Sequence, residues 1–231
     1  MAGNPPPIID PGQPEWQRHH RLVSSQFPPI PLFEDYVDAE LLAAAFEVEG
    51  RTNPRLRAEA GELYLVPEED YVLGDGASPV MAAFTHIGKR SRFTDGSFGV
   101  YYAANSLNTA LLEVKFHRER FLALTHEPPT QQIMRSYTGS IQRPLHDIRG
   151  IGYEKYHDPN LASYHHCQKF SAKLRRTKSW GLLYRSVRDP GGECVAFYRP
   201  PAVGIPIQSK HFVFHWDGKA IRHTYELTKL E

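Results

Sequence analysis

GVYYAA at residues 99–104 and NSLNTALLEV at residues 105–114 carry the clearest structural signal in the chain. The first segment is a short apolar and aromatic run between Gly96 and Asn105, which predicts a buried strand. In the second segment Ser106 can cap a helix, whose apolar side chains recur at i, i+3, i+4 and i+7 in Leu107, Ala110, Leu111 and Val114. The chain therefore passes from a buried strand directly into an amphipathic helix.

Two hairpins are predicted near the end of the chain. Residues 182–188 and 193–198 are rich in strand-forming residues and flank the turn sequence DPGG at 189–192. Phe212, Phe214 and Trp216 alternate with Val213 and His215 before Asp217-Gly218, which is a strong turn signal.

Helices are expected over residues 35–50, with Gly50 as the stop, and over residues 161–179, ending at Gly181. Residues 51–90 mix short apolar runs with Gly, Pro and Asp, so we expect irregular structure with one short helix. Because strands and helices mix without a regular βαβ rhythm, the chain is predicted to be α+β, with mixed or antiparallel sheets and packed helices.

The composition excludes several classes of protein. The 231 residues include 27 Lys+Arg and 26 Asp+Glu, a net charge of +1, which argues against a protein that mainly coats nucleic acid or an anionic membrane. There is no apolar run of about 18 residues and no secretory signal pattern, so we expect a soluble, cytoplasmic protein without membrane contact. Residues 1–31 hold eight of the 19 prolines and are expected to lie over the domain as an extension, with residues 32–231 as one domain.

Four residues are candidates for chemistry. Glu113 lies beside the apolar face of its helix, so its carboxylate either has a partner or reaches water at the helix boundary. Ser186 is expected in the strand 182–188, either as a functional hydroxyl or as a small strand residue, and Tyr102 is a core aromatic or a ligand-stacking ring. With Arg92 they could converge at a sheet edge and bind a pyrophosphate with ribose hydroxyls. The adjacent residues His165, His166 and Cys167 point in different directions on a helix, so no metal site is predicted.

These segments resemble a known family. Arg92-Phe93-Thr94, Val100–Ala104 and Thr109–Val114 are similar to the central signature of RES-domain proteins, the toxin halves of bacterial RES–Xre toxin–antitoxin pairs. Residues 181–188 and 192–196 resemble the serine-bearing strand of that family and its partner strand. An early arginine of the family matches Arg21 or, alternatively, Arg55.

The resemblance implies a fold similar to ADP-ribosyltransferase toxins, with NAD+ as substrate and no prosthetic group. Glu113 would stabilise the ribose cation or orient the acceptor, and Arg92 and Arg21 would hold phosphate groups. Tyr102 would contact the nicotinamide end, and Ser186 would hydrogen-bond ribose or carboxamide.

Three functions stay open from the sequence. The first is NAD+ cleavage at the nicotinamide–ribose bond, with inorganic phosphate or water as acceptor; the second is ADP-ribosylation of a protein; the third is a non-catalytic interaction domain. The resemblance also implies a cognate Xre-like antitoxin as partner, with a homo-oligomer or hetero-oligomer possible and no direct contact with nucleic acid.

Overall fold

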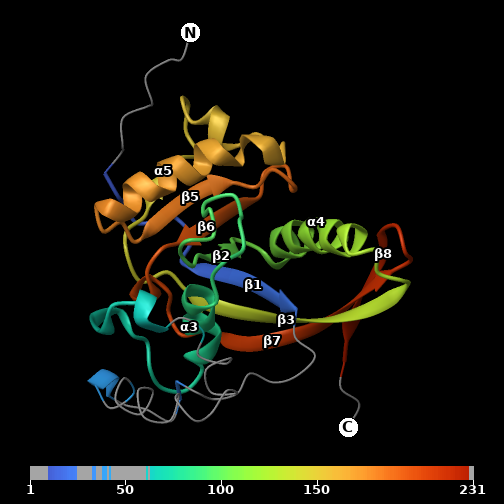
Figure 1. Ribbon diagram of the computed structural model, residues 1–231, viewed down its shortest axis with the longest axis horizontal. Helices are drawn as coiled ribbons and strands as arrows, with labels where there is room; N and C mark the ends of the chain where they lie inside the picture. The colour runs from blue at the N-terminus through green and yellow to red at the C-terminus, as the bar shows by residue number, and fades with distance from the viewer. Residues whose placement is uncertain are drawn as a thin grey trace.

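A single sheet runs through the molecule and carries helices on both faces (Figure 1). The computed structural model describes residues 10–24, 33–34, 38–40, 42, 61 and 63–228. Within these residues eight strands form the sheet, in the order β4-β5-β6-β2-β1-β3-β7-β8. Every neighbouring pair is antiparallel except β4 and β5, which are parallel. The predicted α+β class with a mixed sheet is therefore confirmed.

The strands are β1 (Arg18–Ser24), β2 (Tyr101–Ala104), β3 (Thr130–Ser140), β4 (His146–Asp147), β5 (Gly181–Arg185), β6 (Glu193–Phe197), β7 (Ile207–Trp216) and β8 (Ile221–Leu227). The α-helices are α3 (Ser78–Thr85), α4 (Leu107–Leu124) and α5 (Tyr164–Arg176). The 3-10 turns are Leu63–Leu65, Glu68–Asp70, Glu154–Tyr156, Leu161–Ser163 and Pro200–Ala202. Among the residues described, no helix is long and apolar enough to cross a membrane.

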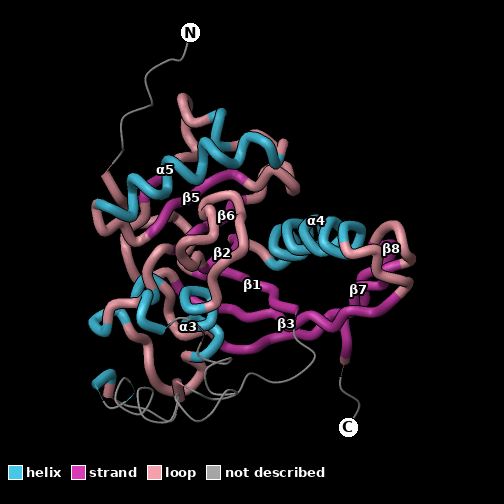
Figure 2. Tube along the Cα trace, in the orientation of Figure 1, coloured by secondary structure: helices cyan, strands magenta, loops and turns pink. Residues whose placement is uncertain are grey.

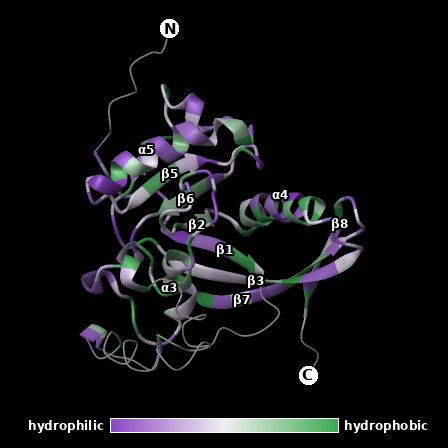
Figure 3. Cartoon of the chain, viewed as in Figure 1, coloured by the Kyte–Doolittle hydropathy of each residue, from purple (hydrophilic) through white to green (hydrophobic). Residues whose placement is uncertain are grey.

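Each face of the sheet has its own hydrophobic core. Because side chains alternate along a strand, Leu182 and Ala196 face α4 and α5, whereas Leu183 and Val195 face α3. Figure 2 shows α5 lying across β5, and α4 above the strands β1 and β3. Hydrophobic and hydrophilic residues interleave along α4 in Figure 3, as expected for a helix with one face on the sheet.

The expectation that residues 1–31 lie over the domain is wrong for residues 18–24. They form β1, an interior strand that pairs with β3 along its whole length and with β2 at one position, His20 opposite Ala104. His19 is fully buried against the rings of Tyr101 and Phe197, at centroid distances of 5.4 and 5.6 Å. A strand inside the sheet must pair on both sides, and this pairing fixes the segment in place.

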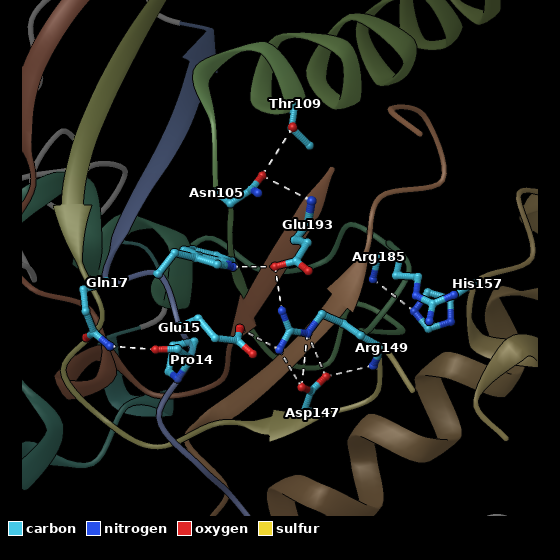
Figure 4. A network of polar contacts seen from close by, with 11 residues as sticks. Pro14, Glu15, Gln17, Asn105, Thr109, Asp147, Arg149, His157, Arg185 and Glu193 are labelled. Atoms are coloured by element: carbon cyan, nitrogen blue, oxygen red, sulfur yellow. Dashed lines mark hydrogen bonds and ion pairs between the residues drawn. The ribbon is translucent and has the colours of Figure 1, made fainter. Parts of the chain in front are cut away.

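An ion-pair network attaches the chain before β1 to the sheet (Figure 4). Arg149 binds Asp147 through two guanidinium nitrogens, with Nη2 at 2.7 Å, and reaches Glu193 Oε2 at 2.6 Å and Glu15 Oε2 at 3.0 Å. The indole Nε1 of Trp16 donates to the same Glu193 oxygen at 2.6 Å. The network thus joins three segments that are far apart in sequence: the entry to β1, the end of β4 and the start of β6.

Both predicted hairpins are confirmed, with different boundaries. The strand expected over residues 182–188 ends at Arg185, and β6 follows after a turn. The helix expected over residues 161–179 begins as a 3-10 turn and ends at Arg176, because Lys178 takes a left-handed conformation with φ 58°. Gly181, expected to end that helix, lies in β5, where a Cβ would stand 2.4 Å from the carbonyl oxygen of Ala196.

Two other stretches complete the comparison. The short helix expected within residues 51–90 is α3, whereas most of the helix expected over 35–50, including Gly50, lies outside the described residues. The long strand β3 was not predicted, although it pairs with both β1 and β7 near the middle of the sheet.

Candidate active site

Glu113 is positioned by the start of α4. The Ser106 hydroxyl caps this helix by accepting a hydrogen bond from the Thr109 amide at 3.1 Å, as its sequence position predicted. β2 ends two residues before the helix begins, so α4 leaves the sheet at a fixed angle beside β1 and β2. Glu113 lies in the second turn of α4, on the side that faces these strands.

A cavity of about 270 Å3 lies where β1 and β2 separate below α4. The two strands are joined at one position, His20 opposite Ala104, and their pairing does not continue beyond it. The Arg21 Nη1 atom then donates to the carbonyl oxygen of Tyr102 at 3.0 Å, across the gap. The residues that line the cavity are His20, Arg21, Leu22, Ser91, Arg92, Tyr102, Ala103, Ala104, Ala110, Glu113, Val114, His117, Arg118, Tyr184 and Cys194.

Ser186 lies behind Glu113 and holds its carboxylate. The Ser186 hydroxyl donates to Glu113 Oε1 at 2.6 Å and accepts the amides of Arg188 at 3.2 Å and Asp189 at 3.0 Å. Only 9% of Ser186 is exposed, and it does not belong to the cavity lining. Ser186 follows β5 instead of lying in it, because the chain turns after Arg185. The hydroxyl that contacts Glu113 therefore lies at the start of the turn that joins β5 to β6.

A second contact fixes the same turn to α4. The Thr109 hydroxyl donates to Asp189 Oδ2 at 2.6 Å, and Thr109 is almost fully buried. Gly192 allows this approach, since a Cβ there would lie 2.7 Å from the Thr109 hydroxyl oxygen. The turn between β5 and β6 is thus attached to α4 at two points, one turn of the helix apart.

Arg92 is buried and held in one position. Its Nη1 atom donates to the carbonyl oxygens of Tyr156 and Asp158, both at 3.0 Å, and its guanidinium lies 4.4 Å from the ring centre of Tyr164. Arg92 lines the cavity, as the sequence suggested. These contacts show that it also organises the 156–158 loop, and its contact with a ligand phosphate stays a prediction.

Tyr102 reaches the cavity from β2. Its hydroxyl pairs with the Ser91 hydroxyl at 2.7 Å and accepts the Phe93 amide at 2.9 Å. Burial raises the pKa of this phenol, so Tyr102 is neutral at physiological pH. The hydroxyl is therefore committed to the loop that carries Arg92, and the ring is the part of Tyr102 left to meet a ligand.

Arg21 carries a buried nitrogen without a partner. Its guanidinium lies 4.2 Å from the ring centre of Tyr101, and no described residue accepts a hydrogen bond from its Nε atom. Burial lowers the pKa of this group. A buried guanidinium with an unmatched donor is typical of a site for an anion. The structure thus places Arg21 at the cavity, whereas the alternative, Arg55, lies outside the described residues.

The sequence analysis missed two cavity residues on α4, His117 and Arg118, and gave no role to a third cavity residue, Tyr184 of β5. His117 follows Glu113 by four residues, a spacing that places both on one side of a helix and could have identified it. His117 lines the cavity and is partly exposed to solvent. Desolvation, followed by the positive charges of Arg188 and Arg92, lowers the pKa of its imidazole to about 4. Its imidazole is therefore neutral at pH 7.

Arg118, next to His117, donates from Nε to Gln132 Oε1 at 2.7 Å and lines the same wall. Among the described lining residues, Glu113 is the only carboxylate and stands against three arginines, Arg21, Arg92 and Arg118. This balance favours a ligand that carries negative charge. The described residues contain no cluster of His, Cys, Asp or Glu that could hold a metal ion.

The family assignment agrees with this arrangement. Residues 62–217, more than half of the chain, match the family model described as RES domain. The chain belongs to the RES domain family. The resemblance noted in the sequence is therefore confirmed, and the matched region includes four of the five candidate site residues, the exception being Arg21.

Two similar proteins accompany this assignment. The RES chain is 30% identical over 207 residues to the uncharacterized protein y4oC of Sinorhizobium fredii (strain NBRC 101917 / NGR234), covering 89% of this chain and 86% of that protein. It is also similar to a chain in the crystal structure of the M. tuberculosis MbcT–MbcA toxin–antitoxin complex, at 16% identity and a TM-score of 0.36, over 60% of this chain and 72% of that one.

Proposed function

We propose that this RES chain is the toxin of a toxin–antitoxin pair and depletes NAD+ by cleaving the bond between nicotinamide and ribose. The observation that supports it most is the Glu113 carboxylate, which Ser186 holds at 2.6 Å on the wall of a cavity that also contains three arginines, Arg21, Arg92 and Arg118. Cations around the cavity suit the pyrophosphate of NAD+, and a single carboxylate suits the positive charge that develops on ribose.

The proposed reaction breaks the C1′–N bond, and nicotinamide leaves with the bonding electron pair. The ribose then carries oxocarbenium character, which the Glu113 carboxylate stabilises through space. An oxygen of inorganic phosphate or of water forms the new bond to C1′, giving phosphorylated or free ADP-ribose. The proton lost from the acceptor passes to solvent.

Each remaining site residue has a role in this proposal. Arg21, through its unpartnered Nε, and Arg92 bind phosphate oxygens, either of the pyrophosphate or of the attacking phosphate. The Tyr102 ring stacks against the nicotinamide end. Ser186 acts as a positioning residue for Glu113, which differs from the direct ligand contact suggested by the sequence.

The partner proposed for this toxin is an Xre-like antitoxin. This follows from membership in the RES family and from the toxin–antitoxin role that the family resemblance implied. ADP-ribosylation of a protein would use the same carboxylate and the same cavity, so the two reactions are distinguished by their products.

The test is mass spectrometry of the products formed from NAD+, with and without inorganic phosphate. We expect nicotinamide together with phosphorylated or free ADP-ribose, and a loss of turnover of about 100-fold or more in Glu113→Gln, because the amide keeps the shape and removes the charge. Thermal melting of the variant serves as the folding control. If NAD+ is stable in both buffers, or if Glu113→Gln turns over normally, the proposal is refuted; a labelled protein acceptor instead of free product would favour protein modification.

A further inference from the structure

The outer edge of β8 is an unpaired strand edge at the end of the sheet. β8 is the last strand in the sheet order, and six of its seven residues are exposed. Among the described residues no strand pairs with its outer side, and the Ile221 amide at its start donates to Glu119 Oε1 at 2.7 Å. The other end of the sheet differs, because β4 is two residues long and the adjacent Leu145 is bridged to Gly12. Figure 1 shows β8 beside β7, away from α5.

β8 carries only some of the features that protect an edge. Its sequence IRHTYEL contains no proline or lysine, its charged residues are Arg222 and Glu226, and its pairing with β7 is irregular only at its start, next to Trp216. Tyr225 and Leu227 are 55% and 45% exposed on the face that also carries His223, opposite His215 of β7. An edge strand of this length and composition is suited to pair with another strand.

We infer that two copies of this chain associate by antiparallel pairing of their β8 strands about a two-fold axis at Thr224. In this register Arg222 of each copy lies opposite Glu226 of the other, and His223 lies opposite Tyr225. Ile221, which is buried in the core of its own chain, lies opposite Leu227, so the charged and the aromatic residues are the ones that meet a suitable partner across the axis. Because IRHTYEL is complementary to itself when reversed, a second copy is the occupant that fits this edge.

Neighbouring registers are worse. A shift of the axis to His223 or to Tyr225 moves Arg222 away from Glu226 and leaves both charges without a cross-strand partner. The charged pairs would add to the contacts that already exist within the chain, where Arg222 Nε binds Asp217 at 2.9 Å and Lys210 Nζ binds Glu226 at 2.9 Å. The self-complementary charges thus select one register and an isologous, closed dimer.

The first test is sedimentation velocity over a range of protein concentrations. We expect a reversible dimer that Arg222→Glu weakens about tenfold or more, because two attractive pairs become repulsive. Glu226→Arg should act alike, and the double variant Arg222→Glu/Glu226→Arg should dimerise again. Circular dichroism and the melting temperature of each variant confirm that the exposed substitutions leave the fold intact.

A crosslink identifies the register. Two Thr224→Cys copies place their thiols opposite each other at the axis, so a disulfide forms under mild oxidation. In His223→Cys copies the thiols are diagonal to each other, about 7–8 Å apart, and should not join. Cys167 and Cys194 are buried and do not compete.

A chain that stays monomeric at all concentrations overturns the inference, as does a dimer indifferent to both charge reversals or crosslinked equally by both cysteines. If the chain is monomeric while Arg222→Glu weakens binding of a co-purified antitoxin, the edge belongs to that partner and self-pairing is wrong. None of these readouts depends on NAD+ cleavage, so the inference and the proposed function can fail separately.

Discussion

Replacement of Ser186 by alanine should slow NAD+ turnover far more than it weakens NAD+ binding. The variant removes the hydrogen bond to Glu113 Oε1, at 2.6 Å, while the carboxylate itself remains. It also leaves the amides of Arg188 and Asp189 without their acceptor, since both donate to the Ser186 oxygen. A carboxylate that is free to rotate spends less time beneath the developing ribose cation.

The size of the effect follows from the type of bond lost. A hydrogen bond to a charged group contributes about 1.5–3 kcal/mol. Since about 1.4 kcal/mol corresponds to a factor of ten in rate, kcat should fall about 10- to 150-fold if the whole effect is felt in the transition state. Because Ser186 is absent from the cavity lining, KM for NAD+ should change by no more than about threefold.

A double-mutant cycle with Glu113→Gln decides between positioning and direct contact. If Ser186 acts through Glu113, Ser186→Ala has little further effect in the Glu113→Gln background. The matched control is Ser171→Ala, which removes another buried hydroxyl. This hydroxyl is 2.7 Å from the Tyr198 hydroxyl, and neither residue lines the cavity. The control variant should lower stability by about 1 kcal/mol without slowing turnover. Additive losses in the cycle, or a rise in KM with kcat unchanged, would refute the positioning role.

Two further predictions concern stability. His19 is fully buried and its pKa is lowered to about 3, chiefly by burial and then by neighbouring Arg21, so the folded state excludes the protonated ring. The stability that the neutral ring contributes is complete above pH 6.5 and is lost as the pH falls toward 3. Urea titrations should show that the free energy of unfolding falls by about 3 kcal/mol between pH 6.5 and 4. This fall should be smaller in His19→Phe, and an equal fall in the variant would show that His19 is not responsible. Arg149→Met should destabilise the fold by about 1–3 kcal/mol, because Glu193 and Asp147 lose their cation. The control Lys210→Met, at an exposed ion pair, should change the stability by less than about 0.5 kcal/mol. Equal effects of the two variants in thermal melts would contradict a structural role for the network.

The candidate site was more predictable than the strands that build it. Glu113 and Ser186 each had an ordinary structural interpretation beside the functional one, and they were selected as candidates because their combination with Arg92 and Tyr102 resembles the RES family signature. What the sequence could not show is that they contact each other, since the turn after Arg185 decides which way the hydroxyl points. The contact depends on tertiary pairing of β5 with β6, which leaves no local pattern.

β1 and β3 were missed for a related reason. In β1 the buried residues are His19 and Leu22, three positions apart, and β3 buries Arg135 and Ser136 side by side, so neither shows the apolar alternation of a half-buried strand. In β1 two of the polar residues, His20 and Arg21, line the cavity. Functional positions break the pattern that predicts a strand.

The cavity and the sheet are linked through Arg21. Where β1 and β2 separate, the backbone carbonyl of Tyr102 accepts the Arg21 guanidinium at 3.0 Å, so a side chain closes a gap that strand pairing leaves open. The Nε atom of the same guanidinium is buried and has no partner among the described residues. A ligand phosphate on Arg21 would therefore fix the side chain that joins the two strands, and binding would also stabilise the centre of the sheet. This explains why an arginine about seventy residues before Arg92 in the sequence belongs to the same site: the cavity exists because β1 lies beside β2.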